Sequence, residues 1–357
     1  MRRLGVLLLL LLWLPTRALA VPDTPYAPET VICPADLSEG ALAAIEVLYP
    51  AVRGGGAFVE LPDGVSYDDA NAAMRSLTRD YPELFHLANS WKIAYWQDAP
   101  ELATGVMPGY SMETDAYQAR LAELLAAAGA LVGRAEGERA DRAEALHDLL
   151  CEGTAYTDDE NGDNTAVGAL LTGATRCEGY AKGLALLYRL AGIPCGVVIG
   201  EVSDSRGVSG HAWNIAVIDG QPTLIDATWN DQGDGGNTHW YYGLTTGMMA
   251  ADHTPDPELT VPECPSILLN WHARRGLLVS DEAGVFAALR RLTREGEVSI
   301  RFTDAALYAD VDARMNEWFR AYNAACAPGE AFYGGYGVIT SEEQLCMRLR
   351  ALEEEQP

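Results

Sequence analysis

The chain has 357 residues, of which 48% are hydrophobic and 8% aromatic, an ordinary composition for a globular protein of two or three domains. It carries 51 acidic and 25 basic residues, which gives a formal net charge of −26 at pH 7. Nucleic acids and anionic membrane surfaces are bound through basic patches, so this balance argues against both as partners. Acidity would favour a cationic substrate, but it more often reflects solubility.

The first 20 residues have the pattern of a secretory signal peptide. Two arginines precede an apolar run over 4–14, and the tripeptide Ala-Leu-Ala ends at residue 20. The run is shorter than the roughly 20 residues that span a bilayer. We therefore expect 1–20 to be cleaved and the mature protein to be secreted, to the extracellular space or the cell envelope, with no membrane insertion afterwards.

Residues 21–104 are expected to form a small N-terminal α+β domain. The hydrophobic pattern predicts helices over 38–49 and 66–80, a strand over 57–61 and a strand pair around 84–96. Prolines at positions 100 and 108 then mark the boundary with the next domain, which we place over 105–257.

The second domain carries a cysteine in a favourable local setting. Two helices are expected between Ser111 and Cys151, and apolar residues from Leu184 to Ala191 at helical spacing predict a buried helix that begins at or near Cys177. Unpaired N–H groups and the positive dipole end of a helix favour a thiolate at that position. The setting suits a nucleophile.

A predicted β-hairpin brings His211 and Asp226 together. A strand with alternating apolar residues begins at His211, and the dipeptide Asp219-Gly220 forms a strong two-residue turn after it. With that turn, Asp226 falls opposite Trp213 and therefore diagonally beside His211 on the same face of the sheet. A register slip of one residue would separate the two side chains.

Cys177, His211 and Asp226 together suit acyl transfer. A cysteine nucleophile needs a base that helps to form its thiolate, and the base needs a third group that fixes its tautomer and orientation. The residues predict an active site with Cys177 as nucleophile, His211 as base and Asp226 as the orienting acid.

Four sequence blocks around these residues resemble the core of bacterial transglutaminase-like proteins, which belong to the papain-like thiol superfamily. In chain order the blocks are Cys-x-Gly-Tyr-Ala-Lys, Leu-Ala-Gly-Ile-Pro, Gly-His-Ala-Trp-Asn and Leu-Ile-Asp-Ala-Thr-Trp-Asn-Asp, and the similarity covers about 140–253. The resemblance implies the same three roles for Cys177, His211 and Asp226. It also implies an α+β fold in which the nucleophile helix packs on an antiparallel sheet.

Further residues are predicted around this site. Tyr156 and His253 lie in blocks that resemble the family, which implies that they support the site. Trp213 and Trp229 are expected to line the substrate cleft, although core packing explains them equally well. Glu178 departs from the family pattern, in which this position often carries an uncharged residue. A carboxylate beside the nucleophile opposes a thiolate unless it points away.

The remaining polar features indicate no metal ion or cofactor. Seven cysteines in an exported chain allow three disulfides and one reactive thiol, but Cys151 and Cys195 are expected as buried free thiols. No Cys-x-x-Cys sequence occurs, which excludes a zinc ribbon or a thioredoxin-type site. The acidic loops over 158–164 and 231–237 do not match a calcium loop, and the other histidines lack ligand spacing.

Residues 258–357 are expected to form a C-terminal α+β domain. The pattern predicts two helices and two strands, with the helices over 281–294 and 304–325 and the strands over 298–302 and 344–350.

We therefore expect an exported Cys-His-Asp acyltransferase or cysteine peptidase that acts on a protein or peptide substrate. An amine as second nucleophile would give amine transfer, and water would give deamidation or peptide hydrolysis. The alternative is a catalytically minor binding or scaffolding module of the cell envelope that keeps the transglutaminase fold. The oligomeric state stays open.

Overall fold

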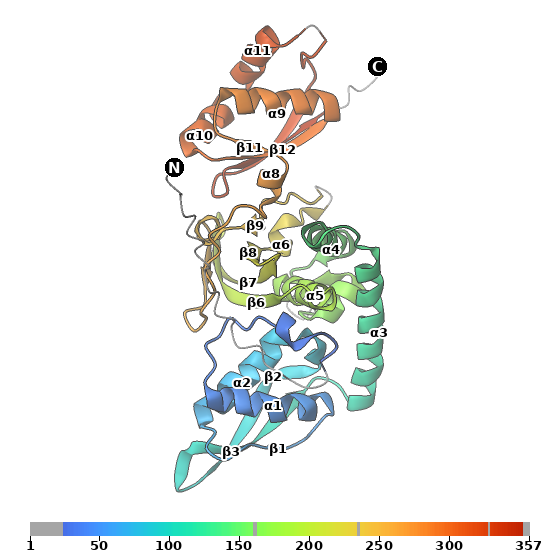
Figure 1. Cartoon of the computed structure of the whole chain (residues 1–357), viewed down its shortest axis with the longest axis vertical. Coiled ribbons are helices and arrows are strands. Elements are labelled where there is room, and N and C mark those ends of the chain that lie inside the picture. Colours follow the sequence, from blue (N-terminus) through green and yellow to red (C-terminus); the bar gives the residue numbers. More distant parts are fainter. Residues whose placement is uncertain (1–23, 160–162, 234–235, 328, 353–357) are drawn as a thin grey trace, which may run out of the picture.

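The computed structural model describes residues 24–159, 163–233, 236–327 and 329–352, so the predicted signal peptide lies outside the described residues. The described chain is an α+β protein whose three larger sheets follow one another along the long axis of the molecule (Figure 1). None of its described helices combines the length and the apolar character needed to cross a membrane.

The first sheet has the strand order β1-β3-β2, with all pairs antiparallel. Two helices, α1 and α2, pack beside it, and each begins after a serine whose side chain accepts a backbone hydrogen bond from the first turn. The helices predicted over 38–49 and 66–80 are thus confirmed. The elements are η1 (Pro28–Thr30), α1 (Glu39–Arg53), β1 (Val59–Glu60), α2 (Tyr67–Asp80), η2 (Pro82–Leu84), β2 (Leu87–Trp96) and β3 (Ala99–Tyr110).

The strand pair predicted around 84–96 is wrong, because this segment is mainly one strand, β2, whose partner is β3. Both prolines that were expected to end the domain lie inside β3, so the predicted boundary at 104–105 cuts a strand. The sheet accommodates both prolines because the β2–β3 register shifts next to the pair Trp91–Pro108 and again near Pro100. A bulge leaves room for a residue that has no N–H to donate.

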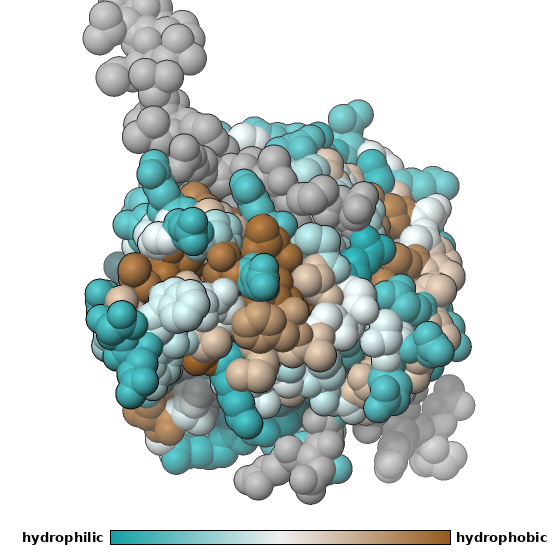
Figure 2. Space-filling model, turned by 90° about the horizontal axis from the view of Figure 1, so that it is seen from below, coloured by the Kyte–Doolittle hydropathy of each residue, from teal (hydrophilic) through white to brown (hydrophobic). Residues whose placement is uncertain are grey.

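The end of the molecule formed by this first sheet is not uniformly polar. Figure 2 looks at this end and shows brown apolar surface among teal side chains. Phe58, Tyr95 and Trp96 are 49%, 53% and 64% exposed, and Tyr67 packs edge-on against Tyr95.

The second sheet has the order β10-β6-β7-β8-β9 and is antiparallel throughout. Helix α5 lies against β6 and β7, and α3 and α4 pack on α5. The elements up to α5 are α3 (Thr114–Arg134), α4 (Arg139–Gly153), β4 (Ala155–Tyr156), η3 (Gly168–Thr172), β5 (Ala174–Thr175) and α5 (Cys177–Leu190). They are followed by β6 (Cys195–Asp204), β7 (Gly207–Ile218), β8 (Gln221–Ile225), α6 (Ala227–Asn230), β9 (Tyr242–Leu244), α7 (Thr246–Met249) and β10 (His253–Pro255).

The first and second sheets share one hydrophobic core. A single cluster of buried side chains includes Ile45 and Leu77 of the first block and Leu184 and Val197 of the second. The buried guanidinium of Arg189 also joins them, because its Nε donates to the Cys195 carbonyl at 2.9 Å and its Nη1 donates to the Tyr26 hydroxyl at 3.2 Å. Helix α5 is therefore braced by the N-terminal block.

The third sheet has the order β11-β12-β14-β13 and its own apolar cluster. The predicted helix over 304–325 breaks at Arg314, which leaves helical backbone with a φ of −125°, and the exposed strand β13 was not predicted. The elements are α8 (Trp271–Arg274), β11 (Leu278–Val279), α9 (Glu282–Glu295), β12 (Glu297–Phe302), α10 (Ala305–Ala313), α11 (Met315–Ala325), β13 (Tyr336–Ser341) and β14 (Cys346–Ala351).

Polar side chains connect these last elements, α8 to β14, to the second sheet; together they are called the C-terminal unit below. The Trp240 indole N–H donates to the Ser299 hydroxyl at 3.1 Å, and Arg301 donates to the Trp240 carbonyl. The Gln344 amide donates to the Asp252 carboxylate at 3.1 Å. Arg301 and Gln344 are both buried, so these contacts lie inside the protein rather than on its surface.

Candidate active site

The hairpin register predicted from the sequence is confirmed. Ile218 pairs with Gln221 and Asn214 with Ile225, so Asp226 follows directly after the last paired residue of β8. Asp219 and Gly220 form the turn with φ values of 50° and 75°. His211 and Asp226 therefore reach each other across the sheet.

The sequence pattern predicted that Asp226 continues the strand. In the structure Asp226 instead caps the short helix α6. Its Oδ1 atom accepts hydrogen bonds from the backbone N–H groups of Thr228 at 2.9 Å and Trp229 at 3.3 Å. Aspartate before a helix satisfies N–H groups that have no partner within the helix. The cap fixes one carboxylate oxygen and leaves the other, Oδ2, for His211.

The His211 ring lies between Asp226 and Cys177. Its Nε2 atom is 2.8 Å from Asp226 Oδ2, while Cys177 lines the same cavity as His211 and helps to raise the pKa of the ring. Because Nε2 is hydrogen-bonded to Asp226, Nδ1 is the ring nitrogen that remains for Cys177. Cys177 is the first residue of α5, as predicted, and its thiol is free, as are those of the other six cysteines, including Cys151 and Cys195.

Neighbouring charges keep this pair ionised. Burial lowers the pKa of His211, but the Asp226 carboxylate and Cys177 outweigh burial and raise that pKa to about 10. Burial raises the pKa of Asp226, and the attraction of His211 together with hydrogen bonds from His211 and His253 holds it well below its usual range. The site thus favours an imidazolium on an aspartate at neutral pH.

We expect His211 to remain charged well above neutral pH. Its pKa of about 10 exceeds the value of about 6.5 for an unfolded histidine, so the stabilisation it contributes is complete below about pH 6.5 and is lost as the pH rises through about 10. A ¹H–¹⁵N NMR titration of the ring checks this. His86, whose pKa burial lowers, is the internal control, and a His211 midpoint near 6.5 would contradict the assignment.

A cavity of about 480 Å³ opens beside Cys177 and His211. Tyr156, which is 47% exposed, and the half-buried Trp229 line it, and the Trp229 ring lies 5.5 Å from the His211 ring. Trp213 is buried and packs on His253 at 4.9 Å, behind the site rather than in the cavity wall.

Glu178 points away from the nucleophile. Its Oε1 atom pairs with Lys182 Nζ at 2.9 Å, one turn along α5. Glu178 also lines a different cavity, of about 510 Å³, together with Arg75 and Trp91 of the N-terminal unit. The Glu178 carboxylate is next to Cys177 in the sequence, but it pairs with Lys182 and points away from the thiol.

Gly179 allows the start of α5 to lie close to β5. A β-carbon at this position would overlap the Thr175 hydroxyl and approach the Thr165 carbonyl oxygen to 2.9 Å. The glycine of the Cys-x-Gly block thus sets the position of Cys177.

We expect Gly179→Ala to lower the rate of the chemistry at Cys177 by about a hundredfold, because an error of about 1 Å in positioning has effects of that size. The measurement is the rate of Cys177 alkylation by iodoacetamide, followed by mass spectrometry. Gly153→Ala, where a β-carbon would meet nothing within 4 Å, is the matched control. Equal rates in the two variants would show that Gly179 has no such role.

His253 lies against Asp226, where the sequence placed a supporting residue. Its Nε2 atom is 3.2 Å from Asp226 Oδ2, and its Nδ1 atom is 2.5 Å from Asp252 Oδ1. Sequence reasoning did not identify Asp252 or its partner Gln344 as part of this arrangement. Asp252 precedes His253 directly, which was an available signal, whereas nothing in the sequence around Gln344 points to the site.

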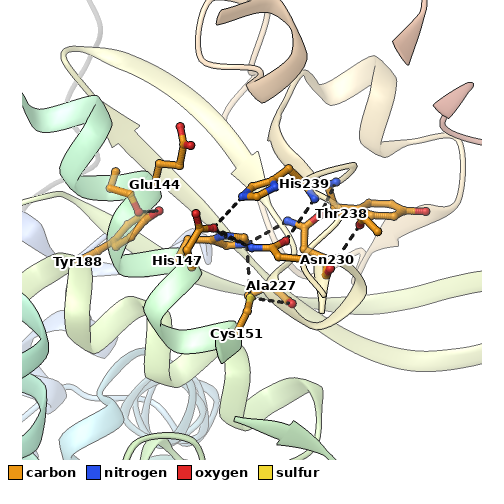
Figure 3. A network of polar contacts seen from close by, with 12 residues as sticks. Glu144, His147, Cys151, Tyr188, Ala227, Asn230, Thr238 and His239 are labelled. Atoms are coloured by element: carbon orange, nitrogen blue, oxygen red, sulfur yellow. Dashed lines mark hydrogen bonds and ion pairs between the residues drawn. The ribbon is translucent and has the colours of Figure 1, made fainter. Parts of the chain in front are cut away.

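A second histidine cluster lies behind α6 and is shown in Figure 3, where His147, His239 and Asn230 point toward one another. Asp148 Oδ1 is 2.9 Å from His147 Nδ1 and 2.7 Å from His239 Nε2. Two imidazoles and a carboxylate at such distances are a candidate cation site.

The hydrogen bonds of Asn230 argue against a cation there. Asn230 Oδ1 accepts from the Tyr241 backbone N–H at 2.7 Å, which fixes the amide, so Nδ2 donates to His147 Nε2 at 3.0 Å. His147 must then carry its proton on Nδ1 and donate it to Asp148, which leaves no lone pair for a metal. The cluster instead holds α6, and thereby Asp226, in place.

Residues 126–229 match the Transglutaminase-like superfamily. The crystal structure of a TGase is similar at 14% identity over 39% of this chain and 44% of that one, with a TM-score of 0.28. A putative cysteine protease from Cytophaga hutchinsonii is also similar, at 14% identity over 39% and 61% of the two chains, with a TM-score of 0.27.

A third similar structure is the periplasmic domain of TgpA from Pseudomonas aeruginosa bound to ethylmercury, at 22% identity over 36% of this chain and 56% of that one, with a TM-score of 0.23. The chain spans less than two thirds of each of these three proteins. No curated protein matches the sequence at a comparable level.

The matched region 126–229 contains the helix that begins at Cys177 and the pair of His211 and Asp226. The chain carries a domain of the Transglutaminase-like superfamily, as the sequence blocks indicated.

Proposed function

We propose that this protein is an exported thiol acyl-transfer enzyme with Cys177 as nucleophile, His211 as acid and base, and Asp226 as the orienting group. One observation carries the proposal: His211 Nε2 lies 2.8 Å from Asp226 Oδ2 at the cavity that Cys177 also lines, which leaves Nδ1 of the ring for the thiol. A nucleophile, a base and a group that orients the base are the parts that covalent acyl transfer needs.

The reaction would pass through a thioester. The Cys177 sulfur attacks a carboxamide or peptide carbonyl, and His211 protonates the amine that leaves. An amine or a water molecule then attacks the thioester, His211 accepts its proton, and Cys177 is released. Unpaired N–H groups at the start of α5 support the negative charge on the carbonyl oxygen.

A protein or peptide segment fits the open cavity at Cys177. Its walls carry side chains of both charges as well as the aromatic rings of Tyr156 and Trp229, and the charged ones are Asp158, Arg176, Asp204, Arg206 and Asp231. Polypeptides offer backbone amides, charges and apolar groups together, which suits such a mixed surface.

The proposal includes the organisation expected from the sequence. Residues 1–20 would direct export to the extracellular space or cell envelope, and α+β domains over 21–104 and 258–357 would flank the catalytic domain, with the first boundary moved beyond β3. The net charge of −26 supports a protein partner over nucleic acid or an anionic membrane surface.

The test is incubation with a glutamine-containing protein and a labelled primary amine. Amine incorporation, ammonia release and peptide cleavage are measured in parallel, and the outcome that depends on Cys177 identifies the reaction. If none of the three occurs on a broad substrate panel, and if alkylation of Cys177 is unaffected by His211→Ala, the protein is a scaffolding or binding module instead.

A further inference from the structure

Asp226 is held by two histidines rather than one. Its Oδ2 atom lies 2.8 Å from His211 Nε2 and 3.2 Å from His253 Nε2. Asp226 is fully buried, and His253 is 2% exposed. The orientation of the carboxylate toward His211 therefore depends on where His253 lies.

His253 faces a carboxylate from each ring nitrogen. Nε2 contacts Asp226, and Nδ1 lies 2.5 Å from Asp252 Oδ1. Both nitrogens must donate to satisfy these acceptors, so the ring is an imidazolium between two anions. Burial lowers the pKa of His253, but the hydrogen bonds and charges of Asp226 and Asp252 raise it overall.

Other groups with charges or protons surround His253 without bonding to it. The His211 and Tyr241 rings each lie 5.5 Å away, and Glu201 on the neighbouring strand β6 is exposed to solvent. The two aspartates are therefore the charges that decide the state of His253 among the described residues.

The second oxygen of Asp252 is held from the C-terminal unit. Asp252 Oδ2 accepts from the Tyr241 hydroxyl at 2.7 Å and from Gln344 Nε2 at 3.1 Å. Gln344 lies in the turn between β13 and β14 and is 1% exposed. It is the residue through which the third sheet contacts this chain of hydrogen bonds.

The Gln344 amide cannot turn without losing bonds at both ends. Its oxygen accepts from Nη1 and Nη2 of Arg301, each at 3.2 Å, and its nitrogen also donates to the Met248 carbonyl at 3.2 Å. Arg301 thus fixes which end of the amide faces Asp252. The amide presents a donor to Asp252 in a single orientation.

We propose that Gln344 is a positioning residue for the active site, which the C-terminal unit supplies to the transglutaminase-like domain. The inference rests on the proposed function of Cys177, His211 and Asp226. Gln344 touches neither substrate nor nucleophile. It holds Asp252, Asp252 holds His253, and His253 keeps Asp226 turned toward His211, so the site depends on a residue far outside the matched region 126–229.

The test compares Gln344→Met, which keeps the length of the side chain and removes its donor, with Asn323→Ala. Asn323 is the matched control because its amide makes two bonds to the Phe332 backbone, at 2.7 and 2.8 Å, within the same unit and away from the site. The measurements, on the full chain, are kcat, KM and the pH dependence of Cys177 alkylation by iodoacetamide.

We expect Gln344→Met to lower kcat about tenfold with KM unchanged, because orientation rather than binding is lost. The pH profile of the alkylation should also change, with a lower rate near neutral pH, since a loosened Asp226 supports the His211 charge less well. Asn323→Ala should leave both quantities at the wild-type values.

An unchanged profile in Gln344→Met would overturn the inference, and so would an equal displacement in Asn323→Ala, because the effect would then report stability of the unit. If Gln344→Met does not fold, Gln344→Leu also removes the amide donor to Asp252 and must displace the profile in the same direction. A wild-type profile that does not respond to His211→Ala would instead overturn the proposed function itself.

Discussion

Replacing Cys177 by alanine is expected to reduce acyl transfer by roughly a millionfold, the loss seen when the nucleophile of a catalytic triad is removed. No other described thiol can take its place at the site, because the cavity beside His211 contains Cys177 and no second cysteine among the described residues. The measurement is turnover of the substrate that the parallel assays identify, together with trapping of a thioester on the intact protein by mass spectrometry.

Cys326→Ala is the matched control for this variant. Cys326 is also a half-buried free thiol, but it lies at the end of α11, where its sulfur donates to the Asn323 carbonyl at 3.5 Å. It should keep full activity and the thioester adduct. Activity in Cys177→Ala within tenfold of wild type would eliminate the thioester route and leave the fold without the proposed chemistry.

The core of the site was predictable from the sequence because short-range rules determine it. The turn at Asp219-Gly220 needs left-handed backbone at both positions, and this sets the register that brings Asp226 to His211. The apolar spacing predicts where α5 begins, and this places Cys177 at the N-terminus of the helix. Each step involves residues that are close in the sequence or joined by one hairpin.

Features that depend on contacts between distant segments were not predictable. Gln344 and Asp252 meet only because the third sheet packs against the second, and no periodicity or turn signal encodes that contact. Pro108 was predicted to mark a domain boundary, yet it lies inside β3, where a shift in the β2–β3 register accommodates a residue that cannot donate to a sheet. In both cases tertiary structure decides what the local pattern leaves open.

The capping role of Asp226 was missed for a different reason. The segment Ile-Asp-Ala-Thr suits a strand by its apolar content, but aspartate followed by alanine and threonine is also a helix start. The cap matters for function because it engages Oδ1 and leaves Oδ2 to both histidines. One side chain thereby ends β8, starts α6 and orients His211.

Asp226→Asn is expected to lower kcat by about ten-thousandfold while the protein stays folded. Asparagine caps a helix as well as aspartate does, and the cap needs an oxygen for the N–H groups of Thr228 and Trp229. The amide oxygen would therefore take the place of Oδ1, and the amide nitrogen would face His211.

A donor in that position forces His211 to carry its proton on Nδ1, the nitrogen that must accept a proton from Cys177. The tautomer is then wrong for catalysis, although every side chain is in place. A ¹H–¹⁵N NMR spectrum of the variant with a proton on Nδ1 and none on Nε2, where the charged ring of the wild type carries both, would show this directly. Asp304→Asn, which alters another helix-capping aspartate that accepts from the Leu307 N–H at 2.7 Å in the C-terminal unit, should stay near wild-type activity. Near-normal kcat in Asp226→Asn would mean that His211 does not depend on this carboxylate for its orientation.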